Sequence, residues 1–534
     1  MRALGGGNME QKGVIFTRRA SGLVRELSWV DVFIFVIAGP AASGITYFSV
    51  ARAADYPGGS IPLGFVIGLA MFLPICALIA MTSAMMPRSG GLYITVSRVV
   101  GPTVGYLCGW MFFVGYGLTI GVLSYVVMGI MGGMFQITGL AAGVDFLIKA
   151  GQAMQTVLGR LISGILWLAF FWMVMLRGIR SIKRVMRIIF AIPLLATGII
   201  VVYFLILGPQ NVMSAFNATW GSGVFQAVTE AARTRGWGFP TFSWPQTVNA
   251  LMVVIWAYVA IEAISFAGGE IKKPKMSMMR GFLGGCVAVG IMYVVVSFAV
   301  YYPFKQFIGA YDFLYDQHPE VLRGIFPGGA AIQPSVPFYA ASIMKSKLLG
   351  LFVSASIALW YANTILPCFL ANSRLAFAMA MDKAMPEAIA DVNPKTGSPT
   401  WAVHITGLFA LLGIVIQAFN VGTILGILNI TALFIFWAFG LAAMLLPFLK
   451  PEIFERSPVR WKWFGVDLIV ILGMITFIEG WFFLFLSAME FNRAILMVTL
   501  AVLFVGMLIF LLQQRKNRKE GVDISKIYSQ IPPE

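Results

Sequence analysis

Ile37-Ala38-Gly39-Pro40-Ala41-Ala42-Ser43-Gly44-Ile45 lies within an apolar run that extends from about residue 30 to residue 51. A run of this length crosses the ~30 Å hydrocarbon core of a bilayer as a helix. Pro40 has no amide hydrogen to donate and disfavours helical geometry at Gly39, while the small residues around it leave the backbone uncovered. In lipid, irregular backbone is tolerated only where it is buried in protein or lines a cavity. We therefore expect a broken membrane helix here.

The whole chain has the composition of a membrane protein. Of its 534 residues, 59% are hydrophobic and 11% are charged, and the mean hydropathy is +0.86. A water-soluble domain of this length needs far more charge on its surface. The apolar runs are too long and continuous for the alternating strands of a barrel, so they predict an all-α polytopic membrane protein.

Twelve apolar segments qualify as membrane spans. Their expected ranges are 30–51, 61–86, 102–135, 161–178, 185–207, 247–269, 281–303, 347–380, 399–417, 421–448, 464–487 and 492–513. This count leaves a polar N-terminal segment (1–29), two groups of five spans (30–207 and 247–448), two further spans (464–513) and a tail (514–534).

The basic residues predict the orientation of these spans. Of the 38 Lys and Arg residues, 28 fall in the two termini and in every second loop. By the positive-inside rule, both termini are cytoplasmic in a multi-pass protein of the cell membrane. The net charge of +16 is thus spread over span ends and forms no single patch for nucleic acid.

The sixth span is the second irregular segment. It contains Trp256-Ala257-Tyr258-Val259-Ala260-Ile261-Glu262 and runs into Gly268-Gly269, although no glycine or proline precedes Gly268. The first and sixth spans hold equivalent places in the two groups of five. Interruptions at equivalent places are typical of a transporter site between inverted repeats.

The two breaks together suit an α-amino acid. The amides of Ser43, Gly44 and Ile45, at the positive end of a half-helix, favour a carboxylate. Carbonyls near Ile37 to Pro40, and from Trp256 to Val259, favour an ammonium group. Small residues also serve close helix packing in membranes, and that alternative reading of the first segment stays open.

Four segments resemble the amino acid–polyamine–organocation (APC) superfamily. They are Ser43-Gly44-Ile45 at the first break, Met86-Pro87-Arg88-Ser89-Gly90-Gly91-Leu92-Tyr93 after the second span, Trp256 to Glu262 continuing to Gly269-Glu270-Ile271-Lys272-Lys273-Pro274, and Ala371-Asn372-Ser373-Arg374 with Ala380 to Pro386. Each motif alone is weak, but their order over about 350 residues on a twelve-span chain is specific.

The resemblance implies ten core helices in two inverted five-helix repeats plus two peripheral helices, and transport by alternating access. It places the substrate carboxylate on the amides of Ala42, Ser43 and Gly44. It places the amine on carbonyls near Ile37, Pro40, Trp256 and Val259, with Trp256 covering the substrate.

The chain also departs from the family pattern. Pro40 is unusual inside the first break, and Ala260 stands where a glycine is frequent. Some proton-coupled members carry a lysine in the fifth helix, whereas Pro193 occupies that position here and residues 188–207 contain no lysine. The coupling ion therefore does not follow from the resemblance.

Glu262 has three competing interpretations, because a carboxylate deep in a span is costly and usually faces a cavity or a partner. It is a gating or proton-relay group, a protonated structural hydrogen-bonder, or a contact for a cationic substrate. Thr364, Asn372 and Ser373 on the eighth span are candidate sodium ligands with first-span carbonyls. Hydrogen bonds between helices explain these three polar residues equally well.

The sequence thus predicts a secondary transporter of α-amino acids with neutral or apolar side chains, by ion-coupled symport or exchange. The alternatives are a cationic amino acid or polyamine carrier using Glu262 as counter-charge and, more distantly, a channel or a non-transporting sensor. We expect no enzyme, no catalytic residue, no metal site and no cofactor, with H⁺ or Na⁺ as the coupling ion. The expected partners are a small amino acid and the lipid bilayer. The oligomeric state and the role of the long external loop (304–346) stay open.

Overall fold

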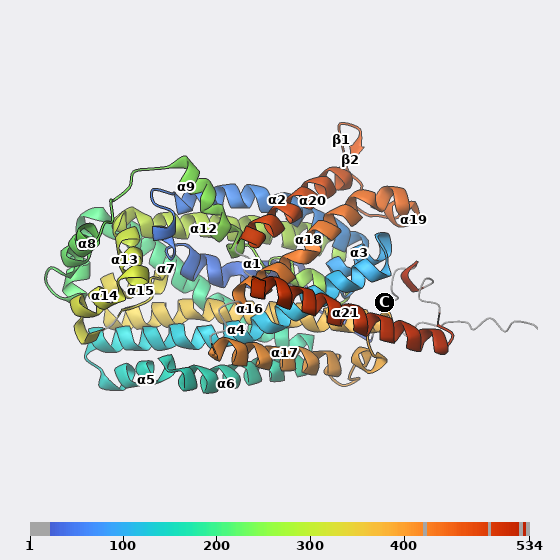
Figure 1. Cartoon of the computed structure of the whole chain (residues 1–534), viewed down its shortest axis with the longest axis horizontal. Coiled ribbons are helices and arrows are strands. Elements are labelled where there is room, and N and C mark those ends of the chain that lie inside the picture. The colour runs from blue at the N-terminus through green and yellow to red at the C-terminus, as the bar shows by residue number, and fades with distance from the viewer. Residues whose placement is uncertain (1–21, 330, 420–423, 490–492, 523–526, 530–534) are drawn as a thin grey trace, which may run out of the picture.

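The computed structural model describes residues 22–329, 331–419, 424–489, 493–522 and 527–529, and these residues are mostly helical (Figure 1). The strands of the described part form one short hairpin, in which β1 (Lys462–Trp463) pairs antiparallel with β2 (Val466–Asp467). The helical class predicted from the apolar runs is therefore confirmed.

Nine helices in the described part are long and apolar enough to cross a membrane, and two shorter apolar helices accompany them. The main membrane helices are α1 (Trp29–Ala42), α2 (Ile61–Met85), α4 (Pro102–Ala142), α6 (Val157–Leu176), α7 (Ile179–Trp220), α12 (Leu283–Phe304), α16 (Lys347–Met381), α17 (Thr400–Ala418), α18 (Ile424–Leu449), α20 (Leu468–Met489) and α21 (Arg493–Lys519). The count of twelve spans stays a prediction, and the first three residues of the expected tenth span (421–423) lie outside the described residues.

Local sequence signals fix where several helices begin and end. Ser60 and Ser346 precede α2 and α16, and each hydroxyl accepts the amide three residues later, which satisfies one free donor of the first turn. α7 continues beyond the expected end of the fifth span, but it bends at Gly208, whose φ is 62°. Pro209 follows this bend, so α7 changes direction close to residue 207, where the fifth span was expected to end.

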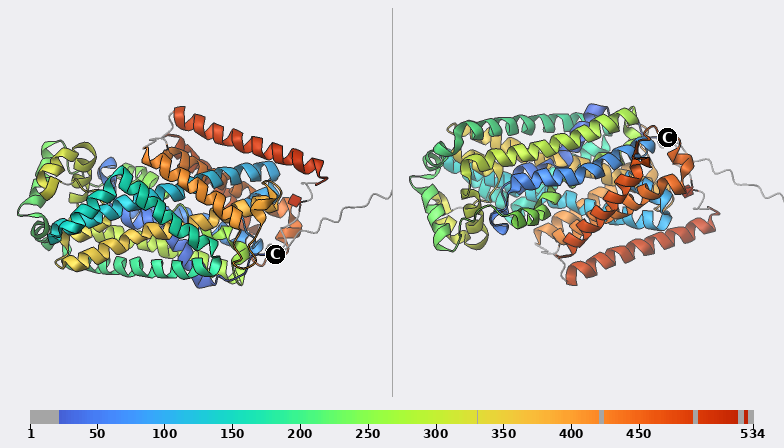
Figure 2. Two further views of the ribbon diagram at one scale, coloured as in Figure 1. Left: turned by 90° about the horizontal axis from the view of Figure 1, so that it is seen from below. Right: turned by 90° about the horizontal axis from the view of Figure 1, so that it is seen from above.

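Two groups of four helices form the centre of the molecule. In the first group, α4, α6, α16 and α17 all contact one another. The second group consists of α1, α2, α12 and the short α10 (Leu251–Ala257), in which α12 and α10 each contact both α1 and α2. α1 also contacts α16, which joins the two groups. α18 packs closely on α20, and α21 lies along one flank of the molecule (Figure 2). Each group combines spans from 30–207 and 247–448, while the repeat symmetry itself stays a prediction.

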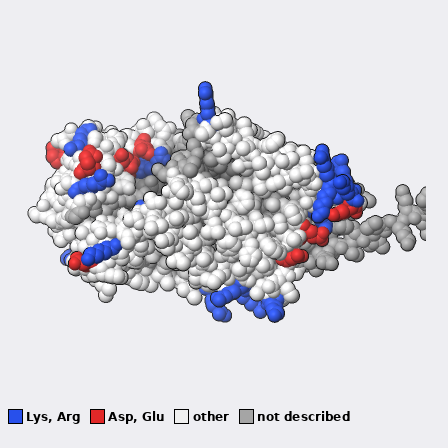
Figure 3. All heavy atoms as spheres, turned by 60° about the horizontal axis from the view of Figure 1, so that its bottom comes forward, with Lys and Arg blue, Asp and Glu red and all other residues white. Residues whose placement is uncertain are grey.

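The two ends of the long axis differ. We call the end that holds α3 (Leu92–Val99), α19 (Pro451–Phe454) and the C-terminal residues the tail end (Figure 1). The opposite loop end holds short helices: α5 (Asp145–Gln155), α8 (Val224–Thr234), α13 (Phe307–Gln317), α14 (Pro319–Ile325) and α15 (Val336–Ile343). Charged side chains gather mainly toward the ends, and most of the face between them is uncharged (Figure 3). This distribution is that of a protein embedded in a membrane.

Candidate substrate site

The first span changes its helical form rather than stopping at Gly39-Pro40. α1 stays α-helical to Ala42, and a single π-helical stretch, η1 (Ser43–Phe48), follows directly. The carbonyl of Ile37 therefore lies in the regular part of the helix, where i to i+4 hydrogen bonds use it. Short π-helical stretches are rare and occur mostly at functional sites. The irregularity thus begins later than the sequence suggested.

The sixth span is interrupted more strongly than its composition predicted. The short helix α9 (Trp244–Asn249) is followed by α10, which ends at Ala257. Turns then lead through Ala260 to the short helices η3 (Ala263–Phe266) and η4 (Gly268–Glu270). Ala260 has a φ of 80°, which an L residue with a Cβ rarely adopts. This backbone conformation favours glycine, as the family resemblance led us to expect at this position, and alanine holds it under strain.

The two interruptions touch each other. A Cβ added to Gly39 lies 2.3 Å from the carbonyl oxygen of Ala260, so only glycine permits this approach. A Cβ added to Gly44 lies 2.3 Å from the ring of Tyr293 on α12. The Tyr293 hydroxyl in turn donates to the Ala257 carbonyl over 2.7 Å. One tyrosine thus connects η1 with the unwound part of the sixth span.

Two residues around the interruption of the sixth span are only partly buried. Trp256 and Val259 are partly exposed, whereas Ile255, Ala257 and Tyr258 beside them are buried. The described residues form no hydrogen bond to the Val259 carbonyl, although that oxygen lies in the unwound stretch. A carbonyl in this state is suited to accept from a ligand, because a buried acceptor otherwise loses its hydrogen bond to water.

The expected residues of the first span are placed differently. Ile37, Pro40 and Gly44 are buried, and the Gly44 carbonyl accepts from Ser49 Oγ over 2.5 Å. The backbone of Ala42 and Ser43 forms the junction between α1 and η1, while their side chains lie outside the described structure. The geometry brings this junction beside the unwound sixth span.

Glu262 points toward α4 and not toward a cation. Its Oε1 accepts a hydrogen bond from the Tyr116 hydroxyl, and its Oε2 forms no hydrogen bond with any described residue. Only 1% of the residue is exposed. Of the five buried acids in the described part, three pair with arginine, whereas Glu262 and Asp312 do not.

The three candidate sodium ligands on α16 do not share one place. Thr364 Oγ1 donates to the Ala38 carbonyl over 3.4 Å, which puts it beside the first span. Asn372 and Ser373 lie eight and nine residues further on, about 12 Å along the helix axis at 1.5 Å per residue. Ser373 Oγ donates to Leu370 O, and both polar atoms of the Asn372 amide lack partners among the described residues. The structure does not bring the three together.

Three of the four motif segments meet at the tail end, all except Ser43-Gly44-Ile45. Gly90 N donates to Phe266 O over 2.9 Å, and Ser89 pairs with Ala267 in an antiparallel bridge. The guanidinium of Arg374 donates twice to Glu270, over 2.9 and 2.8 Å, and both side chains are fully buried. Segments separated by nearly 300 residues therefore form one layer across the tail end.

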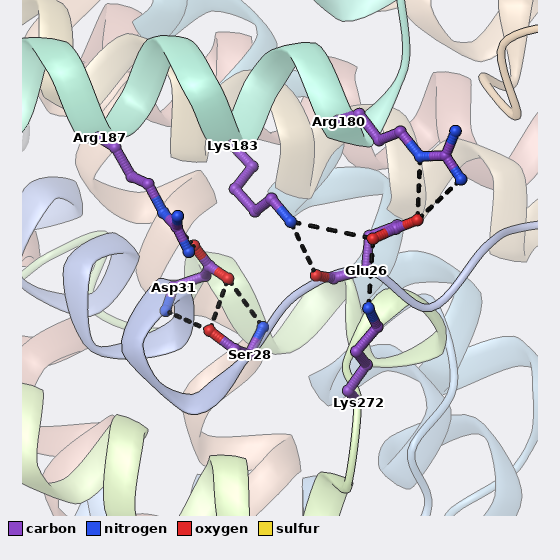
Figure 4. Close-up of polar contacts among 7 residues, drawn as sticks. All are labelled: Glu26, Ser28, Asp31, Arg180, Lys183, Arg187 and Lys272. Carbon is purple, nitrogen blue, oxygen red and sulfur yellow. Dashed lines mark hydrogen bonds and ion pairs between the residues drawn. The ribbon is translucent and has the colours of Figure 1, made fainter.

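A strand-like pairing and an ion cluster add to this layer. Glu26 and Leu27 donate their amides to Glu270 O, and Lys272 N donates to Leu27 O. Figure 4 shows Arg180, Lys183 and Arg187 projecting from α7 toward this N-terminal segment. Glu26 binds Arg180 at 2.9 Å and Lys272 at 3.3 Å, and these two cations lower the pKa of Glu26. The segment just before α1 is thereby fastened to the chain just after the sixth span.

Short helices cover the loop end. α15, which lies within the long loop 304–346, is buried along its whole length and packs on η1, α4, α7 and α16. Asp312 on α13 accepts the amide of Ala54, just beyond the first span, over 2.9 Å. Burial raises the pKa of Asp312 to about 7, and the neighbouring carboxylates of Asp316 and Asp55 act in the same direction.

Sequence reasoning missed Tyr293, Tyr116 and Asp312. The two tyrosines lie in apolar spans with no motif around them, so only the packing of α12 and α4 against the breaks reveals them. Asp312 lay in a loop rich in charged residues, where nothing distinguished it from the exposed acids nearby.

Comparisons with known proteins agree with the family resemblance. Residues 27–513 match the family described as amino acid permease. The chain is 23% identical over 508 residues to a branched-chain amino acid permease of Bacillus subtilis (strain 168), covering 94% of this chain and 96% of that protein. A methylthioribose transporter of the same organism is 23% identical over 513 residues, covering 93% and 95%. A serine/threonine exchanger, also from that organism, is 22% identical over 402 residues, covering 74% and 78%. These relatives are transporters and not enzymes.

Proposed function

Because the chain belongs to the amino acid permease family of multi-pass membrane transporters, we propose that it carries neutral α-amino acids by alternating access. The observation that carries this proposal is the contact between the two broken spans, where the backbone of Gly39 meets the Ala260 carbonyl. Beside that contact lie the α1–η1 junction, for a carboxylate, and the free Val259 carbonyl, for an ammonium group.

A neutral side chain fits the surroundings of this junction. Trp256, near the end of α10, and Val259, in the unwound stretch, are partly exposed, and both are uncharged. The acid of the same segment, Glu262, accepts a hydrogen bond from Tyr116 on α4. Two relatives are named for branched-chain and hydroxylated amino acids, which also have uncharged side chains.

Glu262 is our candidate for coupling transport to protons. It is buried without a cation, and a carboxylate in such a place gains most by taking up a proton. The dispersed arrangement of Thr364, Asn372 and Ser373 gives less support to a sodium site. We place the tail end in the cytoplasm of a cell-membrane protein, because the basic loops lie there.

A cationic amino acid or polyamine is the second candidate, since Glu262 is a buried acid without a basic partner. Methylthioribose is a third, because one full-length relative is named for its transport.

One experiment separates these candidates. The purified protein is screened by thermal shift with leucine, serine, lysine, spermidine and methylthioribose, with and without sodium, at pH 5.5 and 7.5. A ligand that binds the folded state raises the melting temperature. We expect the neutral amino acids to stabilise the protein without sodium. Glu262→Gln should keep this binding and lose the difference between the two pH values.

Stabilisation by lysine or spermidine that disappears in Glu262→Gln would favour the cationic carrier. Stabilisation by methylthioribose alone would replace the amino acid in the proposal. A sodium requirement would contradict proton coupling.

A further inference from the structure

A cavity lies at the loop end, away from the junction of the broken spans. It has a volume of about 780 Å³ and is bordered by four elements: the end of α4, the bend of α7, α15 and the start of α16. None of the residues expected to bind the transported solute lines it. The volume is within the range typical of small-molecule sites.

The walls of this cavity continue into a lipid-facing surface. Tyr203, Ile206 and Leu207 contribute the wall from α7, just before the bend at Gly208. Ile206 is 80% exposed, and Leu348 next to the cavity is 78% exposed. Apolar side chains this exposed at the end of a membrane helix lie against acyl chains. The cavity is therefore open to the bilayer at the level where hydrocarbon gives way to headgroups.

The polar side of the cavity carries positive charge. Lys345 and Lys347 both line it, both are exposed, and neither forms an ion pair with a described residue. α16 begins at Lys347, so the positive end of a 35-residue helix points to the same place. Basic residues are scarce in the loops at this end, and of the two close pairs there, Arg233/Arg235 and Lys345/Lys347, only the second lines this cavity.

One buried group also lacks a partner there. Thr138 on α4 lines the cavity and is only 5% exposed, and its Oγ1 has no hydrogen-bond partner among the described residues. Buried hydroxyls in native proteins are normally hydrogen-bonded, so an unpaired one facing a cavity indicates a ligand or ordered water.

We propose that this cavity binds an anionic phospholipid of the outer leaflet. The phosphate group lies between Lys345, Lys347 and the first turn of α16, and the acyl chains follow Ile206 and Leu207 toward the hydrocarbon. A polar headgroup hydroxyl reaches Thr138. Free phosphate does not explain the apolar wall, and a zwitterionic lipid leaves the two lysines uncompensated.

The lipid would also hold α15, one of the short helices that cover the loop end, in place. The cavity is lined by Ala341 and Ile343 of α15, and Tyr203 donates to the Ile343 carbonyl over 3.2 Å. Because α15 packs on η1, a lipid wedged against it restrains the outer end of the first span. The site thus links the lipid composition to the segment that covers the external mouth.

Native mass spectrometry of the full-length protein, delipidated in detergent and titrated with phosphatidylglycerol or phosphatidylcholine, tests the proposal. We expect one phosphatidylglycerol to be retained in preference to phosphatidylcholine. Lys345→Gln/Lys347→Gln should weaken its binding about tenfold. The matched control, Lys149→Gln/Lys305→Gln, removes the same charge from the same end but outside this cavity and should leave it unchanged.

Equal retention of the two lipids by the wild-type protein would overturn the proposal, whatever the variants do. An equal loss in both double variants would also overturn it, because general attraction to charge would then explain the binding. Full displacement of the lipid by inorganic phosphate would show that only the anion is recognised, and would overturn it as well.

Discussion

At the scale of single residues, the packing of the first span against the sixth depends on contacts too close for a larger side chain. Gly39 approaches the Ala260 carbonyl so closely that the two broken spans can meet, and Tyr293 holds Gly44 and Ala257 together from a third helix. Interactions of this kind determine geometry more than they add stability, since a single neutral hydrogen bond contributes about 1 kcal/mol.

Gly39→Ala should abolish substrate-dependent thermal stabilisation, because its Cβ would lie 2.3 Å from the Ala260 carbonyl oxygen and the backbone must move apart. Gly198→Ala on α7 is the matched control, since a Cβ there meets nothing within 4 Å. That control should fold and bind as the wild type does. Normal binding by Gly39→Ala would show that the contact between the breaks is not needed.

Glu270→Gln should destabilise the protein by roughly 3–5 kcal/mol, because it leaves the buried Arg374 guanidinium without its counter-charge. Glu270→Gln/Arg374→Met removes both charges and should cost clearly less than the single change. Denaturant unfolding of the two variants, beside the exposed control Glu452→Gln, measures the difference. A double variant less stable than the single one would contradict this account of the pair.

At the scale of elements, the sequence predicted the spans well and the irregular backbone only in part. Lipid demands continuous apolar helices, so runs such as 61–86 and 347–380 coincide closely with α2 and α16. No glycine or proline near Ala260 predicts the interruption of the sixth span. Contacts of this segment with α1 and α12 stabilise the irregular backbone instead. Pro40 predicted an interruption at Gly39-Pro40, and this was wrong: α1 continues through Pro40 to Ala42 and passes directly into the π-helical stretch that begins at Ser43.

The short helices that cover the loop end should loosen as the pH rises. Burial raises the pKa of Asp312 to about 7 from an ordinary value of 3.8, so the folded state binds this proton more tightly than the unfolded state does. The resulting stabilisation is complete below about pH 4 and is lost as the pH rises through about 7. The acids Asp316 and Asp55 face the same group and act in the same direction.

Asp312→Asn should therefore have a higher melting temperature than the wild type at pH 8 and a similar one at pH 4. Melting curves across this range measure the effect, with the exposed Glu320→Gln as control. If Asp312→Asn and the wild type lose the same stability between pH 4 and 8, the buried carboxyl is not the titrating group.

At the scale of the whole molecule, three of the four motif segments form one layer at the tail end. They lie far apart in sequence, yet Arg374 reaches Glu270 and Tyr93 reaches Asp382 across the tail end. The sequence identified these segments only through a family resemblance and predicted no contact between them, because no single segment contains both partners of a contact. The tail end is closed by buried ion pairs and the loop end by short helices, with the broken spans enclosed between them.

The central claim is that the junction of the broken spans recognises the amino and carboxylate groups of its substrate. Uptake of a labelled neutral amino acid into proteoliposomes, in competition with the unlabelled amino acid, its N-acetyl derivative and its amide, tests this claim most directly. We predict that the free amino acid competes and that both derivatives fail, because each lacks one of the two charged groups. Equal competition by the derivatives, or uptake of methylthioribose but of no amino acid, would contradict the account.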